Sequence, residues 1–321
     1  MPDDLFAGKR FKPGLAKTVD EEDDSGLSYR SRGQSVIRLG EADIFAAIDR
    51  LPSLPTVVTR ILAQVGSQQS SAADLESLIG QDMVIAGRLM RLVNSPFYSL
   101  ANPVASIAQA VSIIGFASLK SLVMAASVSN LLVLDLSAYG FDDQGLWKNS
   151  IATAGLARVV AQRTGVSRDE AEEYFLAGLM RDVGMLVLGP LLAKHGVALR
   201  RESGEEPIDI LTRERKTLGF DHSWVGERIA DRWLLPARLR QVISCHHRIP
   251  TSAEAPELKQ LAAVRLAERL IYAAGVGVLK NHPFDRRMDG VLIQAAGLDA
   301  AGFQSLMAEV PRIIAGAQVT L

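Results

Sequence analysis

The stretch that decides the fold is EYFLAGLMRDVGMLVL, residues 173–188. Its apolar side chains recur at helical spacing, and a capping-box pattern of Ser167 and Glu170 precedes it, so it predicts an α-helix with one buried face. Arg181 and Asp182 are predicted at the edge of that face. The face itself consists of Leu176, Leu179, Met180, Val183 and Val187.

The composition favours a helical protein. Hydrophobic residues make up 48% of the 321 residues, whereas aromatic residues make up only 6%. Strands favour aromatic and β-branched side chains, and no stretch alternates between apolar and polar residues long enough to require a strand. The sequence therefore predicts an all-α fold made of two helical subdomains.

Helix signals begin near residue 41 and continue along the chain. Residues 56–65 follow two prolines, and Ser71 with Asp74 has the form of a capping box. The residue before a proline is disfavoured in the α conformation, which predicts a helix end at Asn94-Ser95-Pro96. Gly115 predicts a break between the two helices that follow.

The chain divides into three parts by composition. Residues 1–40 contain a basic patch and an acidic run without periodicity, which predicts a flexible tail that is dispensable for folding; it is either a solvated leader or an arm that binds a partner. The turn-rich residues 137–145 predict a boundary. An N-terminal helical subdomain is expected at 41–136, and a helical bundle with extra C-terminal helices at 137–321.

The charge and the apolar runs exclude several classes of function. Lys and Arg total 35 against 36 for Asp and Glu, so the net charge of −1 offers no general attraction for nucleic acid or an anionic membrane. The longest charge-free apolar run, residues 121–134, is shorter than the roughly 18 residues that span a bilayer. Cys245 is the only cysteine, and the first residues lack a secretion signal. A cytoplasmic location is expected.

Several short motifs, taken in order, resemble the HDOD family, a helical relative of the HD-domain metal hydrolases. The resemblance covers roughly residues 43–250 and rests on LPSLPTVVTRIL, ADLESLIGQD, RLMRLVNSPFY, SIAQAVSIIGFASLKSLV, FLAGLMRDVGMLVL, FDHSWVGERIADRWLLP and ISCHH. It implies an N-terminal helical subdomain followed by an HD-like helical bundle. It also implies a cytoplasmic bacterial signalling protein that acts by contact with other proteins.

The resemblance places four residues where the active HD relatives bind a metal: Asn149, Arg181, Asp182 and Glu268. An amide is a poor substitute for imidazole toward a transition metal, and a guanidinium has no acceptor at all. No metal, no cofactor and no enzymatic activity are therefore expected of this chain. Arg181 either forms an ion pair with the two carboxylates or extends past the helix edge into solvent.

Three histidines, His222, His246 and His247, coincide with additional metal ligands of the similar HD-GYP phosphodiesterases. The residues after them lack the Gly-Tyr-Pro element, which argues against cyclic-dinucleotide hydrolysis. Three interpretations stay open for this secondary site. The histidines form a metal cage with Asp182 and Glu268, they are hydrogen-bonded core residues, or they make a pH-sensitive contact.

A second candidate region contains Asn94, Ser95 and Gly115. In one interpretation Asn94 ends a helix and Gly115 supplies a positive φ or close packing. In the other, the loop from Asn94 to Pro103 helps to form a groove for a partner helix or peptide.

The predicted function is that of a non-catalytic cytoplasmic regulator of signal transduction that acts through protein–protein contacts, with no nucleic-acid or membrane partner. Two alternatives belong to other classes. One is a divergent metal-dependent phosphohydrolase that uses the three histidines with Asp182 and Glu268. The other is a nucleotide or small-molecule sensor in which Arg181 anchors a phosphate.

Overall fold

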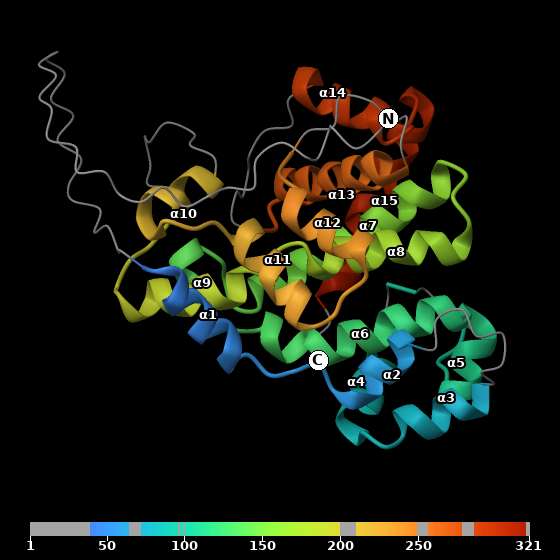
Figure 1. Cartoon of the computed structure of the whole chain (residues 1–321). Helices are drawn as coiled ribbons and strands as arrows, with labels where there is room; N and C mark the ends of the chain where they lie inside the picture. The colour runs from blue at the N-terminus through green and yellow to red at the C-terminus, as the bar shows by residue number, and fades with distance from the viewer. Residues whose placement is uncertain are drawn as a thin grey trace, which may run out of the picture. The chain divides into compact units, whose positions relative to one another are not determined.

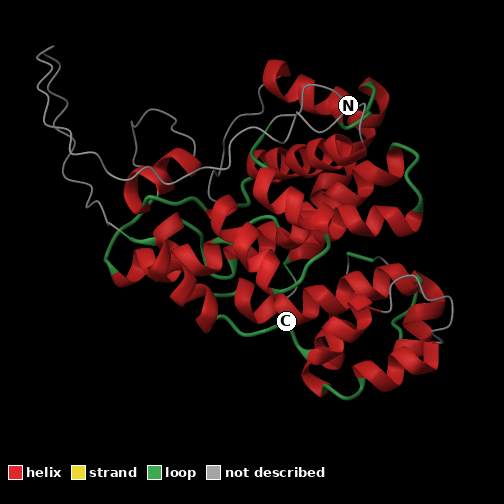
Figure 2. Ribbon diagram, in the orientation of Figure 1, coloured by secondary structure: helices red, strands yellow, loops and turns green. Residues whose placement is uncertain are grey.

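The structure, a computed structural model, describes residues 39–63, 72–95, 97–98, 100–199, 210–248, 256–277 and 286–318. Its regular elements there are helices, and no strand occurs within these ranges (Figure 2). The predicted all-α fold is confirmed. Of the predicted tail at residues 1–40, only Leu39 and Gly40 are among the described residues, and Ser71 and Pro96 also lie outside them.

The predicted helix boundaries at Thr56, Asn94 and Gly115 are confirmed. Asp82 accepts hydrogen bonds from the backbone N–H groups of Val84 and Ile85, and Gly115 separates two helices with a φ of 83°. The helices are α1 (Glu41–Arg50), α2 (Thr56–Ala63), α3 (Ala72–Ile79), α4 (Met83–Val93), α5 (Ile107–Ile114) and α6 (Phe116–Leu132). In Figure 1, α2 to α5 surround one side of α6, which they contact directly or through each other.

Helix α1 packs away from this group, against α9 and α11 (Figure 1). The guanidinium of Arg232 on α11 donates to the backbone carbonyl of Ile48, and the indole of Trp233 donates to Pro52 O over 3.2 Å. The described helices on both sides of residues 137–145 belong to one unit, residues 35–321. The predicted division at residue 137 stays a prediction.

The second half of the chain is built around α7 (Gly145–Arg163), which packs against α8, α13 and α15. Two glycines permit close packing around α7. A Cβ on Gly178 would lie 2.8 Å from Ala154 Cα, and one on Gly155 would lie 2.3 Å from the ring of Phe97. The other elements are η2 (Ser137–Tyr139), α8 (Arg168–Met180), α9 (Met185–Lys194), α10 (Ile210–Leu218), α11 (His222–Arg232), α12 (Ala237–Cys245), α13 (Pro256–Ala273), α14 (Arg286–Ala295) and α15 (Ala300–Ala317).

The stretch 173–188 differs from its prediction in two ways. It is two helices, because α8 ends at Met180 and α9 begins at Met185 after a turn. The predicted position of Arg181 and Asp182 at a helix edge is wrong, since their exposed fractions are 0% and 1%. Gly184 permits a close approach here, because a Cβ there would lie 1.9 Å from the carbonyl oxygen of His222. The chain comes into close contact with α11 at this point.

One apolar stretch among the described helices, Arg168–Lys194, is long and apolar enough to cross a membrane. The helices α14 and α15 meet the same criterion only when they are joined across a bend of 106°. In the first stretch, 89% of the apolar window is buried inside the protein. Its side chains therefore pack against protein, as those of a core helix do.

A buried polar cluster connects the first helices to the second half. Arg158 on α7 donates to the hydroxyl of Tyr98 over 2.8 Å and lies 3.3 Å from a carboxylate oxygen of Glu172 on α8. The hydroxyl of Ser118 on α6 donates to the same oxygen over 2.8 Å. The Arg158 guanidinium also lies 4.9 Å from the centre of the Phe97 ring, within the range of a cation–π contact.

Candidate functional site

The four remnant-site residues meet in the core of the second half. Asn149 lies on α7, Arg181 and Asp182 form the turn after α8, and Glu268 lies on α13. Their exposed fractions are between 0% and 1%. The predicted proximity of Arg181 to both carboxylates is confirmed, and the alternative in which Arg181 reaches solvent is wrong.

The guanidinium of Arg181 is surrounded by four acceptors. Nη1 donates to Gly178 O over 2.8 Å, and Nη2 donates to the side-chain oxygen of Asn149. Nη2 also lies 2.7 Å from Oδ2 of Asp182, and Nε donates to Oε1 of Glu268 over 3.3 Å. Burial disfavours the charged form, but the two carboxylates outweigh it and raise the pKa of Arg181 further. The side chain is a permanent cation.

Two further contacts hold Glu268 in its charged form. Its Oε2 pairs with the guanidinium of Arg265, and Tyr272 donates its hydroxyl to Oε1 over 3.2 Å. Burial opposes ionisation of this carboxyl, but Arg265 and Arg181 outweigh it and lower its pKa. The pKa of the Tyr272 hydroxyl rises well above its usual value through burial and the nearby Glu268 charge. Tyr272 therefore stays a hydrogen-bond donor.

These residues do not fit the metal of an HD hydrolase. A metal at this position needs lone pairs from the side chains at 149 and 181, and Arg181 has none. The amide of Asn149 is committed on both sides, since its oxygen accepts from Arg181 and its nitrogen donates to Val276 O over 2.9 Å. The cation that Asp182 and Glu268 face here is the guanidinium.

The three histidines lie on the other side of Asp182. His222 begins α11, and its Nδ1 lies 2.7 and 2.9 Å from the carboxylate oxygens of Glu214 on α10. His246 follows α12, and its Nδ1 lies 3.0 Å from Ile243 O. The Nε2 atom of His222 lies 3.3 Å from that of His246 and 2.9 Å from that of His247. His222 and His246 are fully buried, whereas His247 is partly exposed.

The local charges set the proton affinity of these groups in opposite directions. Burial opposes the charged form of His222, but Glu214 and then Asp182 outweigh it and raise its pKa to about 9. Burial and the neighbouring His246 and Arg265 lower the pKa of His247 well below its usual value. Burial also opposes ionisation of Asp182, yet Arg181 and the histidines hold the pKa of that carboxyl well below its usual range.

The structure brings together most of the predicted secondary site. Ligand atoms of Asp182, His222, His246 and His247 all lie within 4.8 Å of one another. Glu268 is outside this group and faces Arg181 instead. Cys245, beside the histidines in sequence, is buried as a free thiol.

Sequence reasoning missed the residues that support this site. Glu214 accepts a hydrogen bond from the backbone N–H of His222 in addition to its contact with the His222 ring. The hydroxyl of Tyr139 donates to Glu214 over 2.6 Å. Arg265 and Tyr272 were missed in the same way. Each lies in a stretch without a recognisable motif. A usable signal existed only for Arg265 and Tyr272, whose separations of three and four residues from Glu268 place them on its helical face.

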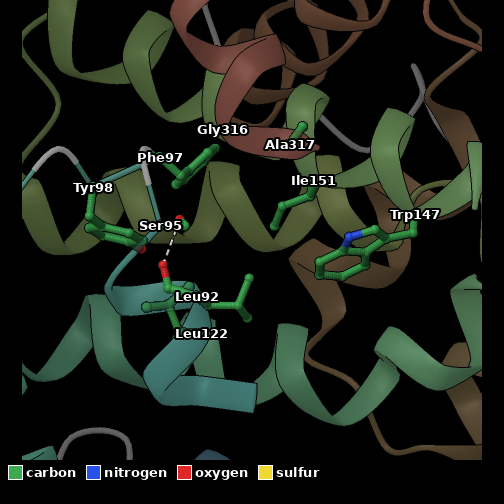
Figure 3. A pocket seen from close by; sticks show the side chains of 9 residues that line it. All are labelled: Leu92, Ser95, Phe97, Tyr98, Leu122, Trp147, Ile151, Gly316 and Ala317. Carbon is green, nitrogen blue, oxygen red and sulfur yellow. Dashed lines mark hydrogen bonds between the residues drawn. The ribbon is translucent and has the colours of Figure 1, made fainter. Parts of the chain in front are cut away.

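In the second candidate region, Asn94 and Ser95 make hydrogen bonds within the chain. Asn94 ends α4 and exchanges two hydrogen bonds with the backbone of Val104, at 2.7 and 3.0 Å. The buried Ser95 donates its hydroxyl to Leu92 O over 2.7 Å, as Figure 3 shows. The pocket in Figure 3, between Ser95, Trp147 and Gly316, leaves no space for a water molecule. The local interpretation of Asn94 and Gly115 agrees with this geometry, and a partner groove stays a prediction.

Comparisons with known proteins agree with this architecture. Residues 51–249 match the HDOD domain family. A Treponema pallidum protein named "Uncharacterized protein" is 26% identical over 215 residues, which cover 66% of this chain and 40% of that relative. This chain therefore spans well under half the length of that relative.

Three solved structures have the same fold. An HDOD domain protein with unknown function from Geobacter sulfurreducens and a Shewanella amazonensis protein named "Putative phosphohydrolase" each give a TM-score of 0.64 at 24% identity, covering 86% of this chain and 97% of theirs. A Marinobacter aquaeolei protein named "Putative signal transduction protein" gives 0.63 at 22% identity, covering 86% of this chain and 64% of that one.

The match over residues 51–249 covers more than half of the sequence and includes Asn149, Arg181, Asp182 and the three histidines, but not Glu268. The match includes residues on both sides of residue 137. The chain belongs to the HDOD domain family.

Proposed function

We propose that this chain is a non-catalytic regulator of signal transduction in the bacterial cytoplasm and that it acts by binding other proteins. The observation that carries the proposal is the fully buried guanidinium of Arg181, which pairs with Asp182 and Glu268 in the place of a metal. A permanent cation cannot bind and activate a water molecule as a Lewis acid does. The signalling role is supported by the family and by the name of the Marinobacter relative.

The contact surface that we propose lies around Gly115, at the junction of α5 and α6. Ile113 and Phe116 flank this glycine and have exposed fractions of 45% and 42%, although both are large apolar side chains. Exposed apolar side chains that occur together are typical of surfaces that bind other proteins. Ile113 lies two residues before the helix break at Gly115, and Phe116 lies one residue after it.

No observation favours the sensor in which Arg181 anchors a phosphate. Its guanidinium already has four protein acceptors, and a phosphate beside Asp182 and Glu268 would meet two negative charges. The hydrolase alternative loses Glu268 from its ligand set, because Glu268 faces Arg181 and Arg265.

The test has two parts. Purified protein supplied with Mn²⁺, Fe²⁺ or Zn²⁺ is expected to hydrolyse neither nucleotides nor cyclic dinucleotides, and turnover that disappears in Asp182→Asn would overturn the non-catalytic assignment.

The contact surface is tested by crosslinking the protein to its partners in the host. Three proteins are compared: wild type, the double variant Ile113→Asp/Phe116→Asp, and the matched control Met307→Asp. Met307 lies on α15 and is 43% exposed. A partner lost in the double variant and kept in the control supports the surface. Equal capture by all three contradicts it.

A further inference from the structure

Three imidazole nitrogens and one carboxylate oxygen converge beside Arg181. The Nε2 atom of His222 lies 3.3 Å from that of His246, 2.9 Å from that of His247 and 3.5 Å from Oδ1 of Asp182. The Nε2 atom of His246 lies 3.2 Å from the same oxygen. Ligands about 2.0 to 2.1 Å from a tetrahedral zinc ion are separated by about 3.3 Å. We propose that Asp182, His222, His246 and His247 bind one divalent transition-metal ion, with Zn²⁺ the preferred species.

Hydrogen bonds behind His222 and His246 direct their lone pairs toward one point. Nδ1 of His246 faces a backbone carbonyl, which can only accept, so Nδ1 carries the proton and the neutral ring has its lone pair on Nε2. Nδ1 of His222 faces the Glu214 carboxylate in the same way. Such partners behind metal-binding histidines are the rule in metal sites.

A proton alone satisfies this cluster poorly. One proton on Nε2 of His222 can be shared with His246 or with His247, but the remaining nitrogen and the Asp182 oxygen then still face each other without a hydrogen between them. A single cation at the centre accepts all four lone pairs together. One proton therefore cannot satisfy every contact among these four groups, whereas a metal ion that displaces this proton would bind all four.

Asp182 has a free coordination position for this ion. Both of its oxygens are buried and have no aligned hydrogen-bond donor among the described residues, although Arg181 lies 2.7 Å from Oδ2. Oδ1 points to the other side, toward His222 and His246. One oxygen therefore neutralises the guanidinium, and the other remains available as a ligand.

The donor set selects the metal and its role. Three imidazoles and one carboxylate suit Zn²⁺ and related transition metals, whereas Mg²⁺ and Ca²⁺ prefer oxygen ligands. The protein fills four positions, as in structural zinc sites, so the ion would join the ends of α8, α11 and α12. His247 is the partly exposed member of this set. The inference concerns binding and does not depend on the proposed function.

The experiment is metal titration of the chelator-stripped full chain with Zn²⁺, followed by desalting and elemental analysis. Wild type is expected to retain about one zinc ion per chain, and the melting temperature is expected to rise on loading. His247→Gln should lose the ion. Glu214→Gln, which removes the charge behind His222, should bind it about 10- to 100-fold more weakly. The matched control His195→Gln changes an exposed histidine that directly follows α9, and it should bind zinc like wild type.

A second measurement covers the case in which His247→Gln does not fold. Co²⁺ bound to wild type should show the intense visible absorption of a tetrahedral site and should be displaced by Zn²⁺. The inference is overturned if wild type retains no metal above the buffer blank, if folded His247→Gln binds as much as wild type, or if bound Co²⁺ shows only the weak spectrum of an octahedral ion. Loss of the ion in His195→Gln would assign it to the surface and would also overturn the inference.

Discussion

Arg181 and Glu268 are separated by 87 positions in the sequence, yet Nε of the first lies 3.3 Å from Oε1 of the second and neither side chain is exposed. Asp182 completes this ion cluster from the other side of the guanidinium. A buried charge is strongly unfavourable without a partner, so each member of the cluster depends on the others.

Arg181→Ala is expected to lower the free energy of unfolding by about 3 to 5 kcal/mol, because it leaves two buried carboxylates without their shared cation. Urea unfolding followed by circular dichroism measures the change. The matched control is Arg240→Ala, which removes an arginine from the exposed pair with Asp231 and should cost less than about 1 kcal/mol. Equal effects of the two substitutions would show that the Arg181 cluster is hydrated.

Replacing both altered ligands should create a metal site where the HD hydrolases have one. Asn149→His with Arg181→His is expected to bind about one more Mn²⁺, Fe²⁺ or Zn²⁺ per chain than wild type, through both new histidines, Asp182 and Glu268. Arg181→His alone should bind no more than wild type, since Asn149 still offers only an amide. Elemental analysis of all three proteins decides this. A folded double variant with the wild-type metal content would contradict the placement of these four residues around one metal position.

The pH dependence of stability should depend partly on Glu268. Its pKa in the folded protein is lowered below that of the unfolded chain, so its contribution is complete above the unfolded pKa of about 4.3 and is lost as the pH falls through the folded pKa. Glu268→Gln removes this titration. The melting temperature of the variant should therefore fall less steeply than that of wild type below about pH 4.5. Parallel curves in that range would mean that Glu268 does not titrate between the two states as described.

Arg158→Met should destabilise the packing of the first helices against the second half of the chain. It removes the partner of the buried Glu172 and the donor to Tyr98, and the expected cost is about 3 to 5 kcal/mol in unfolding free energy. Arg163→Met, at the last residue of α7, changes the more exposed pair with Glu309 and should cost about 1 kcal/mol or less. Chemical denaturation compares them, and a larger loss in Arg163→Met would contradict the assigned role.

Gly184→Ala tests the contact between the turn after α8 and the start of α11. The new Cβ would overlap the carbonyl oxygen of His222, and the expected loss of unfolding free energy is at least about 1 to 3 kcal/mol. Gly87→Ala is the control, because Gly87 lies in α4 with no atom near the added carbon, and it should stabilise by about 0.5 to 1 kcal/mol. Thermal unfolding of both variants gives the comparison, and a neutral Gly184→Ala would mean that this contact relaxes freely.

Much of this architecture could be predicted from the sequence because its signals are local. The break at Gly115 and the end of α4 at Asn94 depend on backbone preferences of a few adjacent residues. The predicted meeting of Asn149, Arg181, Asp182 and Glu268 came from the resemblance to the HDOD family. Neither source indicated that the helix would stop at Met180, because the turn that follows packs against α11, which is distant in the sequence.

The sequence by itself therefore determined the helical class, several helix ends and the absence of a lone pair at Arg181, since each follows from the chemistry of single residues or their near neighbours. Only the tertiary structure decided that Arg181 is buried, that Glu268 serves the guanidinium, and that Glu214 orients His222 toward Asp182. The physical reason is that burial and charge pairing depend on which helices meet. Those contacts join residues far apart in the chain, and no local pattern records them.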